Sequence, residues 1–215
     1  AADDARLRAE YREFDSPQGH GKGRGYLAQP AEPTGPLPSV LVVHENRGLN
    51  PHIEDVARRL ALAGYRAFAP DALFTLGGYP GDEDSARALL PLEGGNGRLG
   101  ATGFCYGGAI VNLLATRLPE LAAAAPYYGG AAPLEGVPDI KAELLVVLAA
   151  DDERVNATWP PYEAALTAAG TRFALFQPEG TLHGFHNDTT PRYSEAAARE
   201  AWAKTLALFE RSLRG

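Results

Sequence analysis

The feature that most constrains the fold is a repeated alternation of apolar, β-branched runs with amphipathic helical segments. Residues 39–45, SVLVVHE, form an unbroken apolar run before two polar residues, which is typical of a strand buried on both faces. The following segment has a capping residue at Asn50, a proline at Pro51 and an apolar face at helical spacing. This alternation predicts an α/β fold, with a mostly parallel central sheet and helices on both faces.

The same pattern continues to the C-terminus, and a chain of 215 residues suits one domain with a full core. We therefore expect a single domain over residues 1–215. The last helix is expected to carry Ala198, Trp202, Leu206 and Phe209 on one face. Further strands are expected at 24–30, 65–70, 98–105, 122–129, 143–152 and 172–178, and further helices at 106–118 and 160–169.

One crossover is short. Between the strand ending near Pro70 and the strand starting at Arg98, only residues 82–90 could supply the helix that a right-handed crossover normally uses. Either this crossover is shortened in the protein, or residues are missing from the sequence between Leu90 and Arg98. An intact-mass measurement distinguishes the two.

Charge and composition limit the partners. The net charge is −7 and there is no run of Lys or Arg, which argues against nucleic-acid binding. There is no apolar stretch long enough to span a bilayer, so no membrane partner is predicted. A monomer and a homodimer both remain open. One cysteine excludes an internal disulfide, so a cytoplasmic location by default and a periplasmic one after removal of a leader also remain open.

Polar groups follow four of the expected strands. Since ligands of a parallel sheet gather outside the carboxyl ends of its strands, these groups are expected to converge on one edge. No metal-ligand spacing is present among them. They are His44 with Glu45, Cys105, Asp151 with Asp152, and His183 with His186.

The order cysteine, aspartate, histidine suits a nucleophile, an orienting acid and a base. Cys105 is the centre of a G-x-C-x-G sequence, Gly103 to Gly107, in which a Cβ at either glycine would clash at a tight strand-to-helix turn. A helix beginning after Cys105 favours the thiolate. His183 would accept the thiol proton, and an aspartate would fix its tautomer. The alternative reading of a lone cysteine is a small buried hydrophobe.

An oxyanion intermediate needs two backbone N–H donors. The residue after the nucleophile, Tyr106, supplies one, and the loop after residues 39–45 supplies the other, with Asn46 the best candidate. His44 and His186 are expected to be structural or to line the pocket.

Several stretches together resemble the dienelactone hydrolase (carboxymethylenebutenolidase) family of the α/β-hydrolase superfamily. They are LVVHENRGLNPHIEDVARRLALAGY, APD, GATGFCYGG, YYG, DERV and GTLHGF. The resemblance implies an α/β-hydrolase fold and a triad of Cys105, Asp152 and His183, in which matching DERV selects Asp152 over Asp151. It also implies a small lactone or ester as substrate, and no metal or organic cofactor.

The resemblance further implies that Glu45 holds the resting thiol and that Tyr127 contacts the substrate. Two arginines that bind the substrate carboxylate in family members are replaced here by Thr75 and Asn187. A guanidinium binds a carboxylate in a way that these side chains do not. A carboxylesterase for neutral short-chain esters is therefore the main alternative. A thiol-based sensor is a second alternative, against which the lack of a second cysteine argues.

Overall fold

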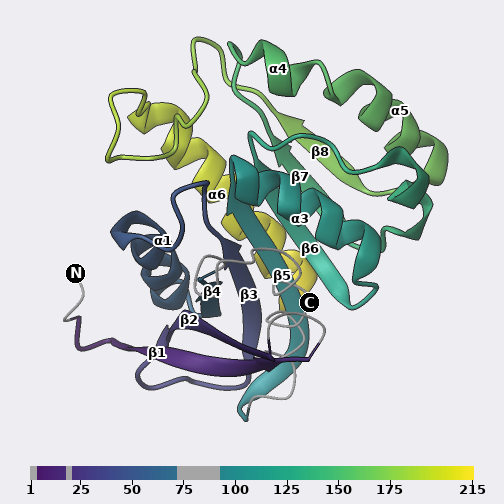
Figure 1. Cartoon of the computed structure of the whole chain (residues 1–215). Helices are drawn as coiled ribbons and strands as arrows, with labels where there is room; N and C mark the ends of the chain where they lie inside the picture. The colour runs from purple at the N-terminus through teal and green to yellow at the C-terminus, as the bar shows by residue number, and fades with distance from the viewer. Residues whose placement is uncertain (1–3, 18–20, 72–92) are drawn as a thin grey trace. The chain divides into compact units, whose positions relative to one another are not determined.

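The computed structural model describes residues 4–17, 21–71 and 93–215 (Figure 1). The chain divides into two compact units, residues 1–100 and 101–215. The predicted crossover helix at 82–90 and Thr75 lie outside the described residues. The single-domain organisation stays a prediction, since neither unit by itself tests it.

The first unit is built on four strands in the order β1-β2-β4-β3. β1 pairs with β2 and β2 with β4 in antiparallel fashion, whereas β3 and β4 are parallel. Every residue of β3 is buried, as its continuous apolar run predicts. The bounds are β1 (Leu7–Ser16), β2 (Gly21–Pro30), β3 (Leu37–Val43) and β4 (Arg66–Pro70).

β1 was not predicted from the sequence. Its residues are mostly polar and exposed, so it lacks the apolar run by which a buried strand is found. It pairs with β2 alone, over ten residues, at the end of the strand order. The Tyr11 ring packs edge-on against Tyr26 of β2, with ring centroids 5.5 Å apart. The Phe14 ring packs edge-on against Phe68 in the same way, with centroids 5.6 Å apart, so the strand is held by pairing and by two aromatic contacts rather than by burial.

Helix α1 (Pro51–Leu62) forms where its sequence predicts it. The Asn50 side chain accepts hydrogen bonds from the backbone N–H groups of His52 (3.0 Å) and Ile53 (3.1 Å), which would otherwise have no partner within the helix. Gly64 has a φ of 90°, a conformation that glycine adopts without strain, and it follows the helix end.

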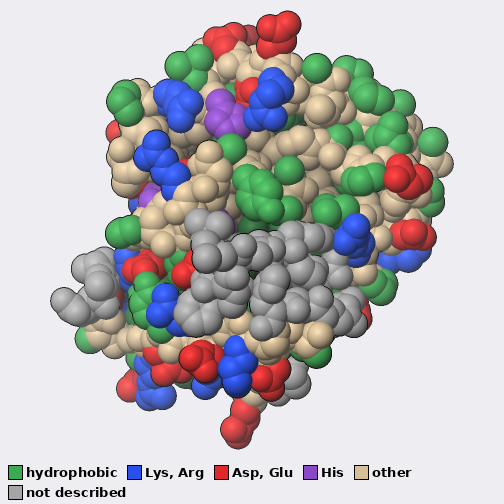
Figure 2. All heavy atoms as spheres, in the orientation of Figure 1, with side chains coloured by type: hydrophobic (Ala, Val, Ile, Leu, Met, Phe, Trp, Pro, Cys, Tyr) green, Lys and Arg blue, Asp and Glu red, His purple; other side chains and the backbone are tan. Residues whose placement is uncertain are grey.

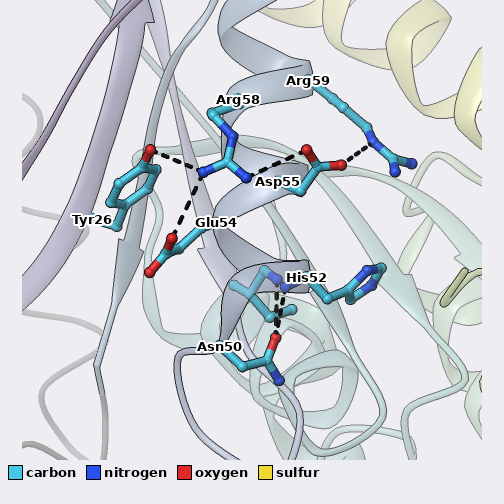
Figure 3. A network of polar contacts seen from close by, with 8 residues as sticks. Tyr26, Asn50, His52, Glu54, Asp55, Arg58 and Arg59 are labelled. Carbon is cyan, nitrogen blue, oxygen red and sulfur yellow. Dashed lines mark hydrogen bonds and ion pairs between the residues drawn. The ribbon is translucent and has the colours of Figure 1, made fainter. Parts of the chain in front are cut away.

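A polar network joins α1 to β2 (Figure 3). Arg58 Nη1 donates to the Tyr26 hydroxyl at 3.0 Å and lies 3.7 Å from a Glu54 oxygen. Arg58 Nη2 lies 3.4 Å from Asp55, whose other oxygen accepts from Arg59 at 2.7 Å. Tyr11 donates to Glu54. The largely buried guanidinium of Arg58 is therefore neutralised by two carboxylates of its own helix.

The second unit contains strands in the order β5-β6-β7-β8. β6 and β7 are parallel, as are β7 and β8. β5 begins in the first unit and ends in the second. The bounds are β5 (Gly95–Phe104), β6 (Leu121–Tyr127), β7 (Glu143–Val147) and β8 (Phe173–Phe176).

Helices of the second unit pack on both faces of its sheet. In Figure 1, α3 lies in front of the strands and α6 behind them, and both contact β6. This agrees with the predicted layering. The helical segments are α3 (Tyr106–Arg117), the 3-10 helix η1 (Leu134–Asp139), α4 (Glu153–Asn156), α5 (Trp159–Ala169) and α6 (Glu195–Leu213).

The buried face of α6 differs from the expected one. Ala198 and Phe209 are buried as expected, but Trp202 and Leu206 are only partly covered. The buried stripe instead runs through Ala201, Thr205 and Leu208. Small side chains at Ala201 and Thr205 let the helix approach the sheet closely, and this rotates the larger residues to the margin.

Figure 2 shows acidic and basic side chains interspersed over the visible face. Within the described part of the chain, no helix has the length and hydropathy needed to cross a membrane.

Candidate active site

Cys105 lies at a strained turn between β5 and α3. Its φ is 57° and its ψ is −114°, a region that residues other than glycine rarely adopt. Its backbone N–H donates to the Tyr127 carbonyl at 3.0 Å, and its carbonyl accepts from the Ala109 N–H at 3.1 Å. The turn is therefore held at both ends by hydrogen bonds, and the helix begins at the next residue.

Glycines allow the backbones around this turn to approach. A Cβ at Gly103 would lie 2.3 Å from the Gly107 carbonyl oxygen, which confirms the predicted clash at this position. A Cβ at Gly108 would lie 2.4 Å from the Tyr127 oxygen. Since both obstacles are backbone atoms, a side chain could enter only if strand and helix moved apart.

Asp152 and His183 form a direct pair. His183 Nδ1 and Asp152 Oδ2 are 2.5 Å apart, and the two side chains are 22% and 8% exposed. Asp152 also caps α4, with its Oδ1 3.5 Å from the Val155 N–H. Asp151 is exposed and forms a β-bridge with Leu182. Of the two adjacent aspartates, Asp152 therefore contacts the histidine.

The pKa of His183 depends on both Cys105 and Asp152. A hydrogen bond with Cys105 is the largest influence on His183 and raises the pKa of its imidazole. Burial lowers that pKa, and the hydrogen bond with Asp152 raises it again, so that the net direction is upward. His183 thus interacts with both Cys105 and Asp152. Such an imidazole is well suited to take a proton from the thiol.

The N-terminus of α3 adds a partial positive charge beside the thiol. Tyr106 is the first residue of this helix, so its backbone N–H lies at the positive end of the helix dipole. Its side chain is 42% exposed. This amide is the donor predicted from the sequence for an oxyanion.

Glu45 and Asn46 lie in the first unit, in the loop that follows β3. Glu45 is half-buried and Asn46 is exposed. His44 is buried, and its Nδ1 lies 2.5 Å from the Glu45 carbonyl oxygen, which also accepts from Gly48 at 3.2 Å. The loop is therefore ordered by local contacts, and the roles of Glu45 and Asn46 toward Cys105 stay predictions.

Tyr127 is fully buried. Its hydroxyl lies 2.7 Å from Thr205 Oγ1, and burial raises the pKa of its phenol. Its ring contacts Phe104 and the buried ring of His186, which stacks on Phe104 with centroids 5.2 Å apart. His186 thus packs among aromatic side chains. A role of Tyr127 in substrate binding stays a prediction.

Tyr128, which the sequence marks with Tyr127 as a residue that packs or lines the pocket, lies beside His183. Its φ is 36°, and among the described residues it is the only residue besides Cys105 that combines a side chain with a positive φ. Its ring centroid lies 5.0 Å from that of His183. Next to it, a Cβ at Gly129 would lie 2.2 Å from the Ala109 amide nitrogen. The stretch YYG at a strand end was the available signal, since glycine there marks a close approach of two backbones.

One arginine lies beside the histidine loop. A Cβ at Gly184, which follows His183, would be 3.6 Å from Arg192 Nη2. Asn187 is buried, with 5% of the residue exposed, and its Oδ1 accepts from the Thr189 hydroxyl (2.6 Å) and amide (3.0 Å). Arg192 is therefore a candidate for contact with an anionic group near His183.

No cluster of three or more His, Cys, Asp or Glu side chains that could hold a metal ion occurs in residues 4–17, 21–71 and 93–215.

Known proteins resemble this chain over most of its length. The model of the dienelactone hydrolase family matches residues 24–93 and 86–213. An Escherichia coli (strain K12) protein named "Putative carboxymethylenebutenolidase" is 31% identical over 219 residues, covering 86% of this chain and 81% of that protein. The "Putative hydrolase fragment YghX" of the same strain is 60% identical over 86 residues, 40% of this chain and 74% of its own length.

A solved structure is also similar. The crystal structure of a "Putative Dienelactone Hydrolase" from Klebsiella pneumoniae has a TM-score of 0.83 and 28% identity, and the match covers 95% of this chain and 99% of that chain. The fold is that of the α/β-hydrolases, as the sequence predicts. The chain belongs to the dienelactone hydrolase family, and it is a hydrolase of the carboxymethylenebutenolidase type.

Proposed function

We propose that this protein hydrolyses a lactone or small carboxylic ester through a thioester formed on Cys105. His183 acts as general base and then general acid, and Asp152 holds its tautomer and orientation. The observation that carries the proposal is that the His183 imidazole is hydrogen-bonded to both Cys105 and Asp152, the latter at 2.5 Å. Cys105 itself lies at a strained turn before α3.

The reaction has two halves. In the first, the thiol proton passes to His183, the sulfur forms a bond to the carbonyl carbon, and the ester C–O bond breaks as His183 protonates the leaving oxygen. In the second, a water gives a proton to His183 and attacks the thioester carbon. The C–S bond then breaks, the acid is released, and the sulfur recovers its proton from His183. With a lactone, the leaving hydroxyl stays attached to the acyl chain throughout, and the product is a single hydroxy acid.

Two backbone amides would stabilise the oxyanion in each half. Tyr106 at the start of α3 is one donor, and Asn46 is the other. Glu45 would hold the thiol in the resting enzyme, and a carboxylate in that position discourages the thiolate until substrate arrives. A Cys105→Ser variant should then be much weaker than the parent, because the site is matched to a thiol. Equal activity would remove the support for this role of Glu45.

Alkylation tests the proposal directly, because Cys105 is the chain's only cysteine. Iodoacetamide should abolish ester hydrolysis in proportion to the thiol modified, and a substrate or product should slow the modification. A His183→Gln variant should react more slowly at neutral pH, because the thiol loses the imidazole that accepts its proton. Full hydrolysis by fully alkylated protein would exclude Cys105 as nucleophile.

A carboxylesterase for neutral substrates is the second candidate. Asn187, at the position where family members carry a carboxylate-binding arginine, favours it, whereas Arg192 beside Gly184 favours an anionic substrate. Turnover of a neutral p-nitrophenyl ester and of an anionic lactone should be compared in the parent and in Arg192→Gln. If the anion is the better substrate, the variant should lose activity toward it and keep activity toward the neutral ester.

A further inference from the structure

Thr181 ties together the two loops that carry Asp152 and His183. It lies two residues before His183, and its partners Ala150 and Asp151 come just before Asp152. The Thr181 side chain is buried, with 2% of the residue exposed. A buried hydroxyl at this place has its hydrogen bonds fixed by the surrounding backbone.

One hydroxyl contacts both loops. Thr181 Oγ1 donates to the Pro178 carbonyl at 2.6 Å, which closes the turn in its own loop. The same oxygen accepts from the Ala150 N–H at 3.0 Å, in the loop after β7. Gly180, with a φ of 66°, supplies the left-handed residue that this turn requires.

Backbone hydrogen bonds also join the loops that follow β7 and β8. β7 and β8 end their pairing at Val147 with Phe176. The Asp151 N–H donates to the Thr181 carbonyl at 2.9 Å, and Asp151 forms a parallel bridge with Leu182.

Asn156 also stabilises the loop that carries Asp152. Its Nδ2 donates to the carbonyl oxygens of Ala149 at 2.9 Å and Ala150 at 3.1 Å. Asn156 thus holds the loop that carries Asp152 from within. Thr181 joins that loop to the histidine loop through its hydroxyl and its carbonyl, and Gln177 Nε2 also donates to the Ala149 carbonyl at 3.2 Å.

We infer that Thr181 is a positioning residue that sets the hydrogen bond between Asp152 and His183. Ala150, whose N–H donates to the Thr181 hydroxyl, lies two residues before Asp152, and Thr181 itself lies two residues before His183. Without the hydroxyl, the Ala150 N–H loses its partner, and the two loops keep the backbone hydrogen bond from Asp151 to the Thr181 carbonyl. The loops are then joined less rigidly beside Asp152 and His183. The inference rests on the proposed function for its kinetic consequence, but the hydrogen bond can also be observed by itself.

The kinetic test compares Thr181→Val, which removes the hydroxyl at similar volume, with Thr181→Ser, which keeps it. The Val variant should lose kcat on the order of ten- to a hundredfold, with little change in KM, because small misplacements of catalytic groups are costly. The Ser variant should recover most of the activity. Thr102→Val is the matched control, since Thr102 is also fully buried and donates to the Ala125 carbonyl at 2.8 Å. It should lower stability and leave kcat unchanged.

A spectroscopic test does not depend on turnover. The short hydrogen bond from His183 Nδ1 should give a strongly downfield proton resonance in the parent, in Thr181→Ser and in Thr102→Val. It should be lost or broadened in Thr181→Val. A Thr181→Val protein with the parent's resonance and kcat would overturn the inference. If Cys105 is not the nucleophile, alkylated parent protein remains active, yet the resonance still reports on Thr181.

Hydrogen exchange in the unaltered protein keeps the inference testable even if Thr181→Val does not fold. The amides of Ala150 and Asp151 should be protected and should exchange together with the His183 ring proton, because one opening releases all three. Exchange of the Ala150 amide at the rate of an exposed loop would contradict the role of Thr181.

Discussion

The polar network on α1 and the Cys105 site both gather charged groups, but they are built differently. Around Arg58, the two carboxylates come from the same helix, three and four residues away, and the backbone is regular. Around His183, the partners come from distant parts of the chain. There, Cys105 and Tyr128 also have positive φ values. Local pairing costs little and stabilises a helix, whereas distant convergence with a strained backbone must be maintained by the surrounding fold.

The two regions are expected to serve different purposes, the Arg58 network stability and the Cys105 site catalysis. Disrupting the first region should lower the free energy of unfolding and leave catalysis intact. Disrupting the second should remove catalysis, with smaller or unrelated effects on stability, since strained sites commonly reduce rather than raise stability.

The largest expected effect is that of Cys105→Ala on turnover. The proposed nucleophile disappears while the fold is kept, so kcat should fall by at least about a thousandfold. Ester hydrolysis and circular dichroism should be measured on the same preparation. Arg58→Met is the control that should keep its kcat, and a Cys105→Ala protein as active as that control would break the comparison.

Gly103→Ala should be the most destabilising single change at the turn. The new Cβ would lie 2.3 Å from the Gly107 carbonyl, and moving strand and helix apart should cost about 3 kcal/mol or more. Denaturant unfolding measures this loss. In the control Gly130→Ala, the Cβ would meet no atom of the described chain within 4 Å, so its unfolding midpoint should stay near the parent's. Equal midpoints for the two variants would contradict the close approach at Gly103.

Arg58→Met should cost about 1–3 kcal/mol, because Tyr26, Glu54 and Asp55 lose a largely buried partner. Its neighbour Arg59, whose side chain is 36% exposed, pairs with Asp55 at 2.7 Å. Arg59→Met should cost less, about 0.2–1 kcal/mol. Chemical denaturation of the two variants gives both values, and a larger loss for Arg59→Met would reverse the reading of the network.

The smallest effect is the pH dependence linked to His183. The pKa of His183 is higher in the folded protein than in the unfolded chain. Protonation of His183 therefore stabilises the fold fully at a pH below the pKa of the unfolded state. This stabilisation is lost as the pH rises through the pKa of the folded state. The difference in unfolding free energy between the parent and His183→Gln should therefore shrink from about pH 6 toward alkaline pH.

NMR titration checks the cause of this shift. Cys105→Ala removes the largest raising contact, so the pKa of His183 should fall in that variant. A pKa unchanged by that substitution would show that the thiol does not contact the imidazole.

Much of the fold was predictable from the sequence because it depends on local signals. The cap at Asn50 and the apolar run of β3 are read directly from residue types and spacing. β1 was not predicted because it is polar and exposed. The prediction of the buried face of α6 was wrong because that face depends on the contact between Thr205 and Tyr127. Pairing and close packing between distant segments leave no periodic trace.

The candidate site shows the same division. Cys105 and His183 could be named because strand ends and flanking glycines mark them, whereas the choice of Asp152 over Asp151 came from the family resemblance. Thr181 could not be named, since its contact with Ala150 depends on loop geometry rather than on residue type. The roles of Glu45 and Asn46 stay predictions.

Trapping the thioester tests the central claim most directly. The protein should be mixed with an excess of a slowly hydrolysed p-nitrophenyl ester, quenched in acid within the first turnover, and digested for peptide mass analysis. The account predicts one acyl group per chain, on the peptide that contains Cys105. An acyl group on another residue, or steady turnover with no covalent adduct at any time, would contradict it.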